Sequence, residues 1–72
     1  MYPTIEEVNS AGHVQICTWY RFLNSPGHSA IGFDNFEEVL KQEKVIMDRI
    51  FERYKEFGGM TPQVSKLIGW QI

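Results

Sequence analysis

DNFEEVLKQEKVIMDRIFERYKEFGG (residues 34–59) carries the longest amphipathic pattern in this 72-residue chain. On a helical wheel, its apolar side chains gather within about 60° of one line, as on a helix with one buried face. Asp34 and Glu37 have the spacing of a capping box, and Gly58 offers the left-handed position that ends many helices. The pattern predicts one long helix over residues 35–57. Its apolar stripe consists of Phe36, Val39, Leu40, Ile46, Met47, Ile50, Phe51, Tyr54 and Phe57.

A short helix is predicted after this long one. Thr61 is a good N-cap, and Pro62 fits the first helical position, where a missing N–H is harmless. Gly69 can end the element, so the expected helix covers residues 62–68.

The N-terminal part of the chain predicts two more helices. Thr4 and Glu7 have capping-box spacing, which indicates a first helix over residues 4–9. Ser10 can cap a second helix over residues 11–24. The apolar phase continues through both segments, so one uninterrupted helix is the alternative. We favour a break beside Ser10, because serine and asparagine prefer caps to helix interiors.

The connection NSPGHSAIGFDN (residues 24–35) is rich in turn-forming residues. Pro26 and Gly27 fit the centre of a type II turn. We expect Ile31 and Phe33 to fix this loop to the core. The chain has no alternating apolar pattern typical of a strand.

These patterns predict an all-α fold with a single domain over residues 1–72. The expected architecture is a small bundle of about four helices around one long central helix. The expected helices cover residues 4–9, 11–24, 35–57 and 62–68.

Composition argues against several classes of function. Seven basic and nine acidic residues give a net charge of −2, which disfavours non-specific binding to polyanions. The sequence lacks a signal-peptide pattern and a run of about 20 apolar residues, so we expect a cytoplasmic protein without membrane contact.

Candidate groups for metal binding or catalysis are few. His13 and the single cysteine, Cys17, are four residues apart, but two ligands do not make a zinc site, and His28 would have to supply a third from a loop. No nucleophile has a base and an orienting group at a recognisable spacing. We therefore expect no metal, no cofactor and no enzymatic activity.

The run ICTWYRFLNSPG (residues 16–27) contains more bulky side chains than one helix face can bury. Ile16, Trp19, Tyr20 and Leu23 share the predicted inner face. Phe22 falls at the rim of the apolar arc, and Arg21 points outward beside Val14.

Two interpretations of this rim are open. In the first, the apolar face is simply wide and the following loop covers it. In the second, Arg21, Phe22 and Val14 form a partner-binding surface, because aromatic residues and arginine are enriched at interaction hot spots. The second interpretation predicts a protein–protein interaction module, with a homodimer as one possible form.

Glu43 is unusual because it lies near the centre of the long helix's apolar stripe. A buried carboxylate needs a hydrogen-bond donor, and the candidates are His13, Trp19, Tyr20 and His28. A bond that fixes the helix register, or a helix end that leaves the carboxylate in water, explains Glu43 more simply than acid–base catalysis.

Residues 50–69 offer an alternative function, because their spacing fits a helix-turn-helix DNA-binding motif. Gly58 would occupy the turn, and Leu67 would point inward with Val64. Tyr54 stands where this motif usually has a small residue, and the second helix has only one cation. The candidate DNA contacts are Thr61, Gln63, Ser65 and Lys66.

ICTWYRFLNSPG together with GGMTPQVSKLIGW (residues 58–70) resembles segments of short uncharacterised proteins encoded by phages and prophages. The resemblance covers about half of the chain, contains no functional motif and transfers no site residue. It implies a phage accessory role, in which the protein binds or inhibits a host protein.

Overall fold

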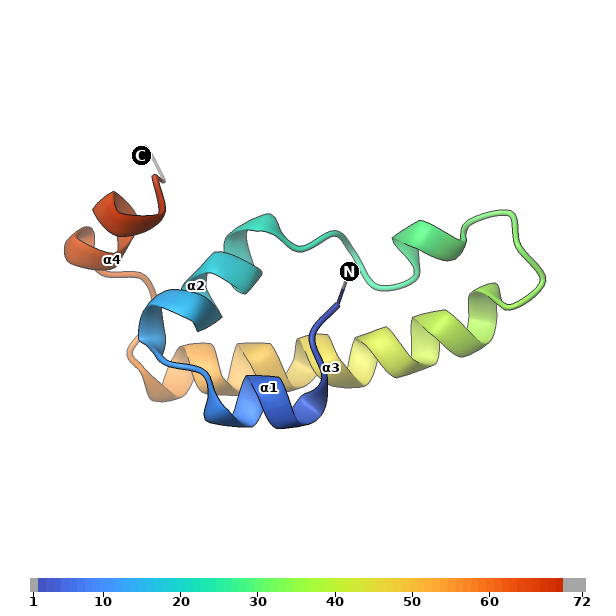
Figure 1. Cartoon of the computed structure of the whole chain (residues 1–72), viewed down its shortest axis with the longest axis horizontal. Helices are drawn as coiled ribbons and strands as arrows, with labels where there is room; N and C mark the ends of the chain where they lie inside the picture. Colours follow the sequence, from blue (N-terminus) through green and yellow to red (C-terminus); the bar gives the residue numbers. More distant parts are fainter. Residues whose placement is uncertain (1, 70–72) are drawn as a thin grey trace.

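The computed structural model describes residues 2–69. These residues form four α-helices and one short 3-10 helix, with no strand among them (Figure 1). The predicted all-α fold with one long central helix is confirmed. The elements are α1 (Ile5–Ser10), α2 (His13–Phe22), η1 (His28–Ala30), α3 (Phe36–Glu56) and α4 (Pro62–Ile68).

The favoured break between the first two helices is confirmed, because α1 ends at Ser10 and is separated from α2 by Ala11 and Gly12. The predicted capping box of α1 forms, because Thr4 Oγ1 accepts from the Glu7 backbone N–H and Glu7 Oε1 accepts from the Thr4 N–H. Ser10 does not cap α2. Its hydroxyl donates back to the carbonyl of Glu6, and Gly12 takes the N-cap position without a side-chain bond.

The start of α3 also differs from the prediction. Asn35 is the N-cap, and it makes no side-chain capping bond. The expected capping box between Asp34 and Glu37 is therefore wrong, because the preceding turn places Asp34 one residue too early to cap the helix. The predicted ends of α3 and α4 are confirmed, since Gly58 and Gly69 have φ of +84° and +77°.

The core lies where α1 and α2 pack along the C-terminal half of α3 (Figure 1). Four buried side chains from these three helices form its centre: Val8, Ile16, Met47 and Ile50. Trp19 and Leu23 pack against this cluster and are half-buried, so their predicted inward direction is confirmed. Tyr20 was also expected to point inward, but 38% of its surface is exposed.

The connection between α2 and α3 returns along the N-terminal half of α3 (Figure 1). Its type II turn is supported by the positive φ of Gly27 and by a 3.0 Å bond from His28 N to the Ser25 carbonyl. The prediction that Ile31 and Phe33 fix the loop is wrong, because they are 65% and 67% exposed. Gly27 contacts α3 instead, and the buried Ala30 anchors η1, so the chain has turned away from the core before Ile31.

Candidate functional site

Exposed aromatic side chains gather around the last turn of α2. The Tyr20 ring stacks on Tyr54 at a centroid distance of 3.9 Å and meets the edge of Phe51 at 5.5 Å. The Arg21 guanidinium lies 5.2 Å from the centre of the Phe22 ring. Phe22 is 56% exposed, and Phe51 is 43% exposed. Two exposed aromatic groups therefore occur here: Phe22 with Arg21 on α2, and Tyr20 with Phe51 where α2 meets α3.

Helix geometry explains why these side chains remain in water. Successive residues of a helix point about 100° apart, so α3 can cover Ile16 and Leu23 but not also Phe22. Val14 lies seven residues before Arg21 on the same outer face, and it is exposed as well. The sequence therefore predicts the positions of Val14, Arg21 and Phe22 relative to the core correctly.

Two members of this surface were not predicted. Tyr20 and Phe51 were both assigned to buried faces, yet each lies at the margin of its apolar arc. The edge of the apolar arc of α2 meets the edge of the apolar arc of α3 at these two residues. No third element of the described chain covers this line of contact. We call the set the α2 surface, and it consists of Val14, Tyr20, Arg21, Phe22 and Phe51.

The residues of the alternative DNA-binding site do not share one exposed face. Ser65 is buried, and the Thr61 hydroxyl accepts the capping bond from Val64 N. Gln63 and Lys66 are exposed. Leu67, predicted to point inward, is 72% exposed, because α4 packs mainly against α2 through its other side.

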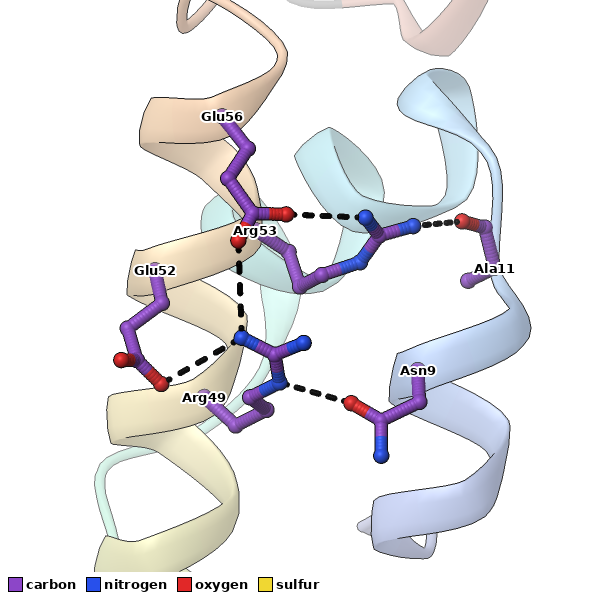
Figure 2. Close-up of polar contacts among 6 residues, drawn as sticks. All are labelled: Asn9, Ala11, Arg49, Glu52, Arg53 and Glu56. Atoms are coloured by element: carbon purple, nitrogen blue, oxygen red, sulfur yellow. Dashed lines mark hydrogen bonds and ion pairs between the residues drawn. The ribbon is translucent and has the colours of Figure 1, made fainter.

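Two arginines of α3 bind α1 and have a structural role (Figure 2). Arg53 donates to the carbonyl of Ala11 at 2.8 Å and to Glu56 at 2.9 Å. Arg49 donates to the Asn9 side chain at 2.6 Å. Arg53 thereby links the break between α1 and α2 to α3.

His13 and Cys17 share a hydrogen-bond acceptor, the carbonyl of Gly59. His13 Nε2 donates to the Gly59 carbonyl at 2.7 Å, and the Cys17 thiol lies 3.8 Å from the same oxygen. Burial raises the pKa of the Cys17 thiol, which disfavours the reactive thiolate. His28 lies on η1, apart from both. Residues 2–69 contain no group of three potential ligands placed to hold a metal ion.

Glu43 has a hydrogen-bond partner that the sequence did not indicate. Its Oε1 accepts from the backbone N–H of Gly27 at 2.9 Å, so none of the four predicted side chains is its donor. This bond ties the α2–η1 loop to α3, whereas the sequence suggested a bond that fixes the register of the helix.

Within the described part of the chain, no helix has both the length and the apolar character needed to cross a bilayer. Comparison of the chain with protein-family models, curated proteins and solved structures gives no match.

Proposed function

We propose that this protein is a protein-binding module and that the α2 surface makes the contact. The observations that carry the proposal are the exposed Phe22 ring beside Arg21 and the exposed pair of Tyr20 and Phe51, both at the C-terminal part of α2. Aromatic residues and arginine supply a large share of the binding energy at protein interfaces. A single exposed apolar residue needs no explanation, but adjacent aromatic rings from two helices do.

The energetics favour a role in binding over a role in folding. Phe22 keeps more than half of its surface in water in the isolated chain, so most of its apolar area contributes nothing to folding. A partner that covers Phe22 would bury this apolar area, and the free energy of that burial would favour association. The phage resemblance extends the proposal, because it would make the partner a host protein, while a second copy of the chain is the simplest alternative occupant.

Site-specific photo-crosslinking tests the proposal in living cells. A benzoylphenylalanine at position 22 or 51 should form discrete crosslinked products, which mass spectrometry can identify as a second copy or another protein. The matched control is position 45 on α3, because Val45 is 57% exposed but lies outside the α2 surface. Products that form equally from position 45, or no product from positions 22 and 51, would contradict the proposal.

A variant pair separates binding from folding. Phe22→Ala should reduce the free energy of unfolding by less than about 1 kcal/mol but weaken association by about 2 kcal/mol. Trp19→Ala should show the reverse order, since this half-buried ring packs against the core. Urea denaturation and the yield of the crosslink from position 51 measure the two effects on the same proteins.

The DNA-binding alternative has weaker support, because Gln63 and Lys66 are the only two of its four candidate residues that are exposed. If α4 contacts phosphates, Lys66→Glu should weaken binding, and affinity should fall steeply with added salt. A gel-shift titration with mixed-sequence duplex at low salt checks this directly.

A further inference from the structure

A small cavity lies just after the C-terminal end of α2, where three parts of the chain meet. The N-terminal segment supplies Tyr2, and α3 supplies Glu43. The other lining residues come from the chain that follows α2. Its volume is about 60 Å³. The lining residues are Tyr2, Leu23, Asn24, Ser25, His28, Ser29 and Glu43.

The Glu43 carboxylate brings a negative charge to this cavity. Lys44, the next residue, extends toward Asp48 at 3.6 Å. Among residues 2–69, no lysine, arginine or histidine lies within ion-pair distance of Glu43. The Gly27 N–H holds one carboxylate oxygen, and Glu43 is only half-buried. The bond to Gly27 therefore orients the group without neutralising it.

Several other polar groups that line the cavity can accept hydrogen bonds, while the His28 ring and the Asn24 amide can also donate them. The Tyr2 hydroxyl donates a hydrogen bond to the Asn24 carbonyl, so its oxygen can still accept one. Burial, and then the charge of Glu43, raise the pKa of Tyr2, which keeps this phenol protonated. The hydroxyls of Ser25 and Ser29 can accept as well. Carboxylate, phenol and hydroxyl oxygens together match a group with several N–H donors.

We propose that this cavity binds a primary alkylammonium group, either on a free amine or on a lysine side chain of the protein partner. A –NH₃⁺ group has three donors and one charge, which suits the acceptors and the uncompensated carboxylate. A cavity of about 60 Å³ has room for this small group, and a quaternary ammonium would bring no N–H donor to the acceptors. The lysine source rests on the proposed function, because Leu23 of the cavity directly follows Phe22 of the α2 surface.

A titration followed by NMR tests the site with methylammonium chloride as the probe. The Gly27 amide resonance should shift in a saturable way, because the carboxylate that accepts from this amide then also binds a cation. Tetramethylammonium chloride and sodium chloride at equal ionic strength should give no saturable shift. Absence of saturation with methylammonium, or equal saturation with tetramethylammonium, would overturn the proposal.

The variant Glu43→Gln separates the charge from the structural bond. Glutamine keeps an oxygen that can accept from Gly27, so the fold should persist in the amide spectrum, while methylammonium binding should weaken at least about tenfold. Glu37→Gln, at an exposed carboxylate elsewhere on α3, should bind methylammonium like the natural protein. A folded Glu43→Gln protein that binds methylammonium as tightly as the natural chain would contradict the assignment.

The source of the amine is decided by combining this titration with the crosslinking. If Glu43→Gln also lowers the crosslink yield at position 22, the amine is a lysine of the partner. If methylammonium binds but the crosslink is unaffected by Glu43→Gln, the cavity serves free amines. If methylammonium binds and no crosslink forms at all, the cavity stands and the proposed protein-binding function fails.

Discussion

Gly27 and Glu43 determine how the long connection lies on α3. Gly27 has φ of +81°, a conformation that glycine adopts without a steric penalty. Its N–H donates to Glu43, and its Cα faces Phe36 and Leu40 so closely that a Cβ would lie 3.1–3.2 Å from their side chains. One residue thus supplies the turn, the polar bond and the close approach.

Two glycine substitutions test this at the residue scale. Gly32→Ala meets open space and should cost about 1 kcal/mol, the penalty of a left-handed alanine at φ of +86°. Gly27→Ala has the same backbone penalty and the contacts with Phe36 and Leu40 in addition, so it should cost about 2–3 kcal/mol. Urea denaturation measures both, and equal costs would show that the approach to α3 is unimportant.

At the scale of single elements, two substitutions at helix starts should differ in their cost. The start of α4 has a side-chain capping bond, and the start of α3 has none. Thr61→Ala removes the acceptor of the Val64 N–H and should destabilise the protein by about 1 kcal/mol. Asp34→Ala should cost about 0.5 kcal/mol or less, because Asp34 makes no capping bond to α3 and contributes only its charge. Thermal unfolding of the two variants side by side checks the difference, and a larger loss for Asp34→Ala would restore the predicted capping box.

The two arginines that join α1 to α3 should differ in importance. Arg53→Met leaves the Ala11 carbonyl without its donor and should cost about 1.5–3 kcal/mol, because the arginine side chain is only 18% exposed. Arg49→Met should cost less than about 1 kcal/mol, since its acidic partners are more than half exposed.

Salt provides the control for this pair. Added sodium chloride should reduce the difference between Arg49→Met and the natural protein, because exposed ion pairs are screened. The cost of Arg53→Met should change little, since its bond to a backbone carbonyl is half-buried. Equal costs at every salt concentration would contradict the assigned roles.

The whole molecule is elongated, with extents of 42 × 24 × 15 Å and a radius of gyration of 13.1 Å. A compact chain of this length would have a radius of gyration of about 11 Å. Elongation limits how much of each apolar arc the chain can cover, which is why the α2 surface remains exposed.

Self-association through that surface would make stability depend on concentration. If a second copy is the partner, the melting temperature should rise by a few degrees for each tenfold increase in protein concentration, because folding is then coupled to dimerisation. Phe22→Ala should abolish this dependence. Sedimentation equilibrium at the same concentrations gives the oligomeric state, and a monomer with a constant melting temperature would exclude a second copy as the partner.

Local patterns in the sequence were sufficient to place the helices and most of their ends. The Thr4 capping box, the Thr61 cap and the glycines after α3 and α4 act on backbone groups within one turn of the helix, so neighbouring residues reveal them. The amphipathic period of α3 likewise reports which side of one helix avoids water. The outward position of Phe22 follows from that same periodicity on α2.

Only the tertiary structure decided where each apolar arc ends and which distant groups meet. Tyr20 and Phe51 are exposed because no other element of residues 2–69 covers the line where α2 and α3 touch. Glu43 meets a backbone N–H sixteen residues away, and a backbone donor has no signature in the sequence. A helical wheel gives the direction of a side chain from its own axis, whereas burial depends on where other helices stop, and that is settled by packing between residues far apart in the chain.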